Sequence, residues 1–282
     1  MRIVSSGKVL NSPEFYKKKK KRRQVRFILV SFSLIAFLSL LVYFSREERF
    51  LVSSVSAIGV LGESVVDKDE IEQSVRRSLT GYYLWLVPKA NILIYPRSTA
   101  RENLLKEFPR LKSVELSLGE ARELLVLVDE RSPSALYCVN ASSSVDVSEC
   151  YFLDEEGFIF APAPSFSDAV YFIYTAESPI EDPPGKTYLA PEEFKPLPKF
   201  IKSLETLDIR PIALEARNDE FVLFLPEGGQ ILWRRGSDTA LVRSNLEAFL
   251  LNDAIQAEEN FLDRILSLDL RTENKVFYRF KQ

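Results

Sequence analysis

A run of nineteen residues without a charge, a proline or a glycine, residues 27–45, restricts the fold of this chain more than any other feature. As an α-helix rising ~1.5 Å per residue, the run would extend about 28 Å, close to the hydrocarbon thickness of a bilayer. The buried helix of a soluble protein rarely runs this long without a polar stripe. A cleaved signal peptide is the second alternative, but the run is long for one, and Ser45-Arg46-Glu47 offers no small-x-small cleavage site. We therefore expect an uncleaved transmembrane helix at 27–45.

The charges on the two sides of this helix differ in sign. Residues 1–26 carry ten Lys/Arg against one Glu, a net charge of +9, and residues 46–282 carry 27 Lys/Arg against 39 Asp/Glu, a net charge of −12. An excess of Lys and Arg marks the cytoplasmic side, so we expect a single-pass protein of the cytoplasmic membrane with its N-terminus inside and its C-terminal domain outside.

The basic run at 17–26 is expected to lie in a disordered tail, residues 1–26. Such a run is also typical of a nucleic-acid or localisation patch. Its place directly before a membrane span favours topology and contact with anionic membrane lipid. The acidic remainder argues against nucleic acid as a partner.

The chain contains no histidine, which removes the usual general base, the Ser-His and Cys-His nucleophiles and the commonest zinc ligand. Asp154, Glu155 and Glu156 precede Gly157 in a turn, where acidic residues serve turn geometry. No glycine-rich phosphate loop is present. An anchored Ser/Lys protease would carry Ser-Met near the membrane, and here Met1 is the only methionine. We therefore expect no enzyme activity, no cofactor, no metal and no small-molecule substrate.

Residues 50–130 alternate between strand and helix patterns. We expect a strand at 52–62, followed by a helix that Asp67 caps and Gly81 ends, with Ile71, Val75 and Leu79 on one face. A second helix is expected from Ser98 to Phe108. Two strands, 114–118 and 124–128, are expected to follow, joined by a turn at Gly119-Glu120. Residues 85–87, before Pro88, are expected to form an apolar loop. Two helices covering one face of a three-stranded sheet make a small α+β domain.

Residues 131–282 are rich in strand patterns and predict a mostly antiparallel β domain with flanking helices. The expected strands are 135–138, 150–153, 158–160, 169–174, 212–216, 221–225, 230–233, 265–270 and 275–280. Residues 177–198 contain six prolines and are expected to be irregular. Helices are expected at 200–207 and after Ser237 or Asp238, the latter with Leu241, Leu246, Phe249 and Leu250 on its buried side.

Two cysteines, Cys138 and Cys150, are separated by eleven residues and form no C-x-x-C motif. In an oxidising compartment a disulfide between them would close a short loop and contribute ~3 kcal/mol. Two buried free thiols are the alternative, and the expected external location favours the disulfide.

The chain ends in a β-prone segment, residues 275–280. A terminal strand often lies at the edge of a sheet, where its unpaired N–H and C=O groups can accept a partner's strand. The alternative is an ordinary edge strand protected by the charges of Lys275 and Arg279.

Several short motifs, collinear behind the anchor, resemble the FtsQ/DivIB family of bacterial cell-division proteins. They are VSAIGVLG at 55–62, WLVPK at 85–89, FPRLKSV at 108–114, VDERSP at 128–133, YFLD at 151–154 with Gly157, WRRG at 233–236 and SLDLR at 267–271. The resemblance implies that 50–130 is a POTRA domain and 131–282 the family's β domain.

The resemblance also implies a function. Proteins of this family are non-enzymatic divisome scaffolds at the division septum, which join early and cytoplasmic components to the FtsB/FtsL pair and to septal peptidoglycan synthesis. Their C-terminal sheet edge takes up a strand from FtsB. Carried onto this chain, the partner-binding residues are Arg271, Val276, Phe277, Tyr278, Arg279 and Phe280. Thr272 stands where the family often has an aromatic residue, and the cysteine-flanked insertion is not a general family feature.

The rival interpretation is a POTRA-bearing protein for translocation or membrane-protein assembly. Such proteins usually carry tandem POTRA units followed by a membrane β-barrel, whereas the sequence predicts one unit and a soluble-looking β domain.

Overall fold

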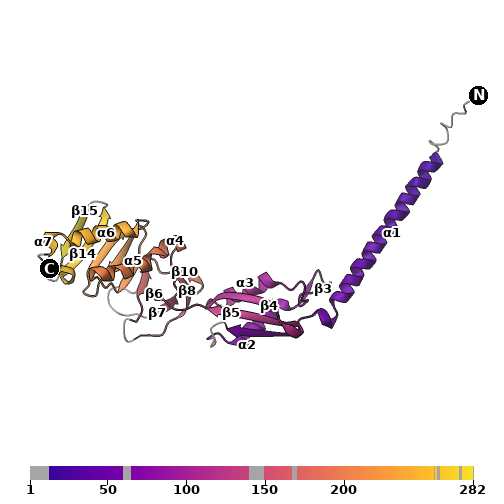
Figure 1. Cartoon of the computed structure of the whole chain (residues 1–282), viewed down its shortest axis with the longest axis horizontal. Coiled ribbons are helices and arrows are strands. Elements are labelled where there is room, and N and C mark those ends of the chain that lie inside the picture. The colour runs from indigo at the N-terminus through magenta and orange to yellow at the C-terminus, as the bar shows by residue number, and fades with distance from the viewer. Residues whose placement is uncertain are drawn as a thin grey trace, which may run out of the picture. The chain divides into compact units, whose positions relative to one another are not determined.

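The structure is a computed structural model that describes residues 13–59, 65–139, 149–166, 170–256, 258, 261–272 and 275–281 (Figure 1). It is a mixed α+β protein with a long N-terminal helix and a largely sheet C-terminal part. The chain divides into two compact units. The first is Met1–Leu104 with Glu115–Leu127, and the second is Leu105–Val114 with Val128–Gln282.

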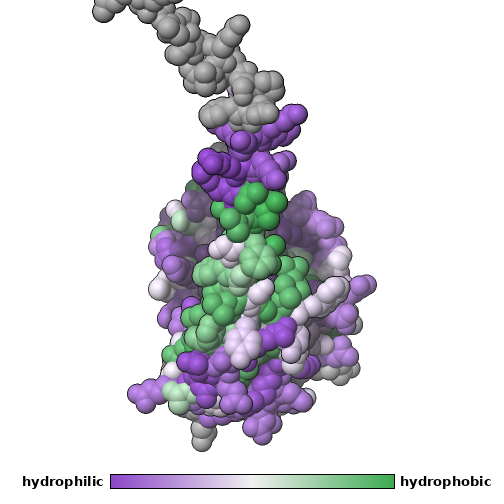
Figure 2. Space-filling model, turned by 90° about the vertical axis from the view of Figure 1, so that its right-hand side faces the viewer, coloured by the Kyte–Doolittle hydropathy of each residue, from purple (hydrophilic) through white to green (hydrophobic). Residues whose placement is uncertain are grey.

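The N-terminal helix α1 covers Pro13–Ser45. Within the described residues it is the one helix that is long and apolar enough to cross a membrane. Figure 2 shows its hydrophilic basic turns directly adjoining its hydrophobic turns. The expectation of a disordered tail is wrong for residues 13–26, which continue the helix, while residues 1–12 lie outside the described residues. Lys and Arg are good helix formers, and extending an existing helix is far less costly than nucleating one.

The first unit contains the expected order of strand, helix, helix, strand and strand. Its elements are η1 (Glu48–Phe50), β1 (Ser54–Gly59), α2 (Lys68–Leu79), β2 (Tyr82–Tyr83), β3 (Val87–Pro88), α3 (Arg97–Glu107), β4 (Leu111–Leu118), η2 (Glu120–Arg122) and β5 (Glu123–Glu130). Residues 105–107 of α3, 111–114 of β4 and 128–130 of β5 belong to the second unit. The three-stranded sheet has the order β1-β5-β4. Residues 60–62 of the expected first strand lie outside the described residues. In place of the expected loop before Pro88, β2 and β3 form a two-stranded ribbon.

Helix α2 confirms the predicted capping. The Asp67 carboxylate accepts a hydrogen bond from the Asp69 amide at 2.9 Å. Ile71 and Val75 are fully buried, and Gly81 follows the C-cap with a φ of +91°. Helix α3 begins at Arg97, one residue before the expected cap Ser98.

The second unit is built on a ten-stranded sheet. Its strands are β6 (Ala135–Val139), β7 (Glu149–Leu153), β8 (Phe158–Pro162), β9 (Ile173–Ala176), β10 (Lys186–Thr187), β11 (Ala213–Ala216), β12 (Glu220–Phe224), β13 (Gln230–Arg234), β14 (Ile265–Thr272) and β15 (Lys275–Phe280). Their order is β10-β8-β7-β6-β9-β11-β12-β13-β14-β15. Neighbours in this described sheet are antiparallel except β6–β9, β9–β11 and β13–β14, so the mostly antiparallel expectation holds.

Helices of the second unit pack on this sheet. They are α4 (Pro191–Phe194), α5 (Pro196–Leu204), η3 (Glu205–Leu207), α6 (Thr239–Leu250), α7 (Asp253–Gln256) and α8 (Phe261–Arg264). The strand expected at 169–174 instead occupies 173–176, and residues 167–169 lie outside the described residues. The connection at 177–198, expected to be irregular, contains β10, α4 and the start of α5. Leu241 is half exposed rather than buried, because α6 turns Val242 and Leu246 toward the core.

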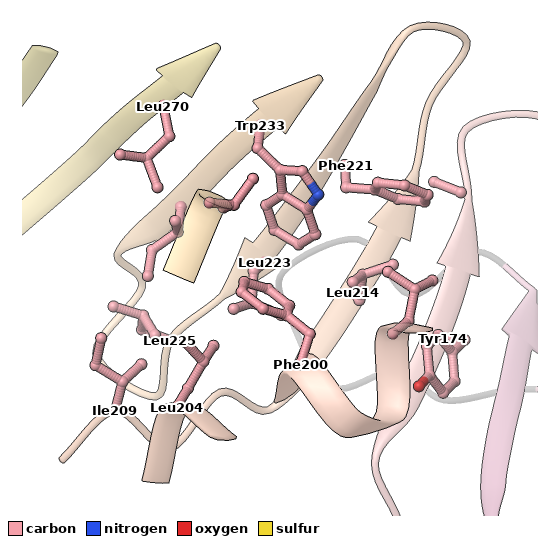
Figure 3. Packing of buried hydrophobic residues seen from close by; sticks show 14 of the residues in the cluster. Tyr174, Phe200, Leu204, Ile209, Leu214, Phe221, Leu223, Leu225, Trp233 and Leu270 are labelled. Carbon is pink, nitrogen blue, oxygen red and sulfur yellow. The ribbon is translucent and has the colours of Figure 1, made fainter. Parts of the chain in front are cut away.

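Trp233 on β13 lies at the centre of the second unit's core (Figure 3). Its side chain is 1% exposed, and its ring centroid lies 5.2 Å from that of Phe200 on α5 and 5.4 Å from that of Phe221 on β12. Burial of such large side chains supplies most of the energy that holds α5 against the sheet.

The ion pair between Arg131 and Asp154, which we call the charged clasp, joins the segment before β6 to the turn between β7 and β8. Arg131, between β5 and β6, donates through Nη1 to Asp154 Oδ2 at 2.5 Å, and its guanidinium carbon lies 3.9 Å from the centre of the Phe158 ring. Asp154 Oδ1 accepts the backbone amides of Glu156 and Phe158 at 2.9 Å each. The acidic residue therefore serves the turn geometry, as predicted. Two motifs that are separate in the sequence, VDERSP and YFLD, meet here.

Cys138 on β6 and Cys150 on β7 stand directly opposite each other in the register. Their sulfurs are bonded, and their Cα atoms are 4.2 Å apart. The residues between the two strands, 140–148, lie outside the described residues.

Candidate functional site: the C-terminal sheet edge

The ten-stranded sheet ends at β15, as the expected terminal hairpin with β14. Leu268 pairs with Tyr278 and Asp269 with Phe277. Among the described residues, no strand pairs with the outer side of β15. Alternate backbone groups of an antiparallel edge strand point away from its neighbour, so β15 presents free donors and acceptors. The opposite edge strand, β10, has two residues against the six of β15.

The side chains of β15 alternate between the helix-covered face and the open face of the sheet. Val276 and Phe280 pack against the core. Tyr278 lies on the same face, with its ring 5.6 Å from Phe249 and 5.9 Å from Phe261, yet it is 45% exposed. Phe277 is 57% exposed. The edge therefore offers a partner one aromatic side chain on each face.

Cationic side chains flank these aromatic residues. Lys275 and Arg279 are exposed, and Arg279 Nε donates to Ser267 Oγ at 3.4 Å. Lys281, just after the strand, donates through Nζ to the Asp263 carbonyl at 2.5 Å. The charges protect the edge against self-association and favour an acidic partner.

Arg271 lies on β14, one strand in from the edge, and the structure does not bring it onto β15. Its Nη1 donates to Glu220 Oε2 on β12 at 2.8 Å, and its Nε and Nη2 donate to Asp269 at 2.9 and 2.5 Å. The hydrogen bonds from Arg271 lower the pKa of Asp269 below its ordinary 3.8. The same contacts raise the pKa of Arg271. Arg271 thus connects β14 to β12, across β13, on the open face of the sheet. About half of its side chain stays accessible.

Sequence reasoning missed Glu220 and Asp269. Asp269 has a signal in the sequence, because residues two apart on a strand share a face. Glu220 has no such signal, because it lies near Arg271 only when β12 pairs with β13 and β13 pairs with β14.

Arg271→Ala is expected to lower the free energy of unfolding at neutral pH by about 1 kcal/mol or less, because the pair is partly exposed. Asp269 has a depressed pKa in the folded state, so its contribution is present above about pH 4 and is lost as pH falls through the folded-state pKa. The stability gap between wild type and variant should therefore shrink in acid. Urea unfolding, followed by Trp233 fluorescence in a Trp85→Phe background near neutral pH and at about pH 3, measures the difference in the free energy of unfolding. Arg279→Ala, which loses a contact to a hydroxyl, serves as the pH-independent control. If Arg271→Ala lowers the free energy of unfolding by the same amount at both pH values, the ion pair between Arg271 and Asp269 is contradicted.

Groups of three or more His, Cys, Asp or Glu able to hold a metal ion do not occur in the described part of the chain. The fold and site define a class of protein: an α+β chain with an N-terminal apolar helix that could span a membrane and a largely sheet unit that ends in an open aromatic edge. Neither the family models nor the curated proteins compared with the chain give a match.

Proposed function

We propose that this chain is a single-pass scaffold of the bacterial division machinery. In this proposal α1 spans the cytoplasmic membrane with its basic turns inside, and β15 takes up a strand from an FtsB/FtsL-like partner outside. The protein thereby links early and cytoplasmic division components to septal peptidoglycan synthesis. The observation that carries the proposal is the position of β15 at the end of the sheet order, with Phe277 and Tyr278 exposed on its two faces.

In strand addition the backbone and the side chains have different roles. The main-chain groups of β15 supply pairing that depends little on sequence, while side chains at alternate positions select the partner. Phe277 would contact the incoming strand on the open face, and Tyr278 would contact it on the helix-covered face. Arg279, and Arg271 through its accessible part, would add charged contacts at the rim.

The first unit supports the same proposal. Its β1-β5-β4 sheet with α2 and α3 has the element order expected of the POTRA domain that precedes the β domain in the FtsQ/DivIB family. The run of basic residues before the apolar turns of α1 supports an N-terminus on the cytoplasmic side.

Replacing Tyr278 by proline is expected to abolish partner binding. Proline has no amide hydrogen and interrupts the ladder at the middle of the edge. Tyr278→Ala is the matched control, because it also loses the contacts with Phe249 and Phe261 but keeps the backbone amide. Pull-down of the full-length chain in detergent with a tagged FtsB/FtsL-like pair measures binding.

We expect the alanine variant to retain a substantial part of the binding that the proline variant loses. Circular dichroism, and Trp233 fluorescence in a Trp85→Phe background, establish that both variants are folded. A folded proline variant that binds like wild type would exclude the edge as the binding site. Fluorescent tagging in cells tests the division role separately: enrichment at midcell supports it, and an even distribution over the envelope favours the translocation or assembly alternative.

A further inference from the structure

The ribbon formed by β2 and β3 carries an apolar tip that is almost fully exposed among the described residues of the first unit. Leu84 is 88% exposed and Trp85 90% exposed, the two highest values among the large hydrophobic side chains of the described residues. Tyr82, Leu86 and, on the following segment, Leu93 and Ile94 are also exposed. We call these six residues the ribbon patch. A contiguous exposed apolar patch usually marks a contact surface.

Large apolar residues are unusual in the backbone conformation of the turn at the tip. The Leu86 amide donates to the Tyr83 carbonyl at 2.9 Å, which closes a β-turn inside the three-residue loop between the paired residues Tyr83 and Val87. Leu84 and Trp85 occupy its two central positions with φ of +47° and +61°. Asn and Gly are the residues that favour these backbone conformations. Packing against the described residues of the first unit does not explain a leucine and a tryptophan here, because both are almost fully exposed.

The ribbon patch lies beside the end of the apolar helix. Arg46, the first residue after α1, donates through Nε to the Leu86 carbonyl at 3.0 Å, and its guanidinium carbon lies 5.9 Å from the centre of the Tyr82 ring. Asn91 Nδ2 donates to the carbonyl of Ser45, the last residue of α1, at 3.0 Å. The patch is thus attached at the point where the uncharged run ends.

We propose that the ribbon patch inserts into the outer lipid interface of the membrane that α1 spans, with Trp85 as the interfacial residue. Tryptophan and tyrosine are enriched at the headgroup level of bilayers, where an apolar ring and a polar edge are both accommodated. Tyr43 and Phe44 are exposed in the last turn of α1 and belong to the same level. The inference rests on the proposed membrane span, because the hydrogen bonds to Ser45 and Arg46 locate the patch only relative to that helix.

Lipid is favoured over a protein as the occupant of the patch because of this continuity. If the uncharged turns of α1 are surrounded by acyl chains, a neighbour hydrogen-bonded to the last turn lies at the boundary between chains and headgroups. The guanidinium group of Arg46, which lies next to Tyr82, can form an ion pair with a lipid phosphate. The ribbon would then give the first unit a second attachment to the bilayer.

Fluorescence quenching by brominated lipids tests the insertion on the full-length chain in vesicles. The chain has two tryptophans, so Trp233→Phe leaves Trp85 as the sole probe. We expect its emission to be quenched strongly by lipids brominated near the headgroup and less by lipids brominated near the bilayer centre. We also expect Leu84→Glu, in the same background, to abolish most of this quenching.

Two further probes separate the possible failures. Phe37→Trp, in a background with both native tryptophans replaced by phenylalanine, reports on α1 and should be quenched most by deep bromines. Leu241→Trp in the same background reports on a half-exposed position of the second unit and should be quenched little. Quenching of Phe37→Trp without quenching of Trp85 would overturn the ribbon proposal alone. Absence of both would overturn the membrane span and the ribbon proposal with it. Equal quenching at Trp85 and Leu241→Trp would show general surface association and would also overturn it.

Discussion

Replacing Arg131 by alanine is expected to lower the free energy of unfolding of the second unit by about 3–5 kcal/mol. The side chains of Arg131 and Asp154 are 12% and 4% exposed, so the substitution leaves a buried carboxylate without its counter-charge. It also removes the guanidinium from the face of the Phe158 ring. Urea unfolding of the full-length protein in detergent, followed by Trp233 fluorescence in a Trp85→Phe background, measures the loss.

The same turn provides a matched control. Lys112 Nζ bonds Glu155 Oε1 at 3.2 Å, but the Glu155 side chain is 75% exposed. Lys112→Ala should therefore cost about 1 kcal/mol or less. Adding Asp154→Asn to Arg131→Ala removes the unpaired charge while keeping an oxygen for the amides of Glu156 and Phe158, so part of the stability should return. If Arg131→Ala and Lys112→Ala lower the free energy of unfolding by the same small amount, the structural role of the charged clasp is contradicted.

Replacing both Cys138 and Cys150 by alanine is expected to lower the free energy of unfolding by about 3 kcal/mol. The disulfide joins directly opposed positions of β6 and β7 and closes a short loop, so its main effect is to restrict the unfolded chain. Reductant should destabilise the wild-type protein by a similar amount and leave the double alanine variant unchanged. A wild-type unfolding midpoint that is indifferent to reductant would refute this role, as would free thiols found by mass spectrometry in oxidised protein.

Local signals account for most of the elements that the sequence predicted correctly. The cap at Asp67, the spacing of Ile71, Val75 and Leu79, and the glycine at position 81 are all local and predict α2 almost to the residue. Alternation likewise predicts β14 and β15. Errors arose where the local signal was weak, as at Ser98 and Leu241, or where a helix extended beyond its apolar part, as α1 does through the basic run to Pro13.

The candidate site was predicted only in part, for a different reason. The hydrophobic pattern of residues 275–280 indicates a strand, but a pattern does not say which strands lie next to it. The edge position of β15 depends on the order of all ten strands, including the parallel pairing of β13 with β14 across the intervening α6. Arg271 shows the same limit, because its partner Glu220 lies 51 residues away.

The amino-acid sequence by itself determined the apolar helix, the charge asymmetry around it, the types of most elements and the pair of cysteines, because each depends on neighbouring residues or on composition. The tertiary structure decided which side chains meet. It brought Arg131 to Asp154, Cys138 to Cys150 and Arg271 to Glu220, and it attached the Leu84–Trp85 tip to the end of α1. These contacts join residues that are not neighbours in the chain, so local sequence signals do not specify them and only the folded arrangement brings them together.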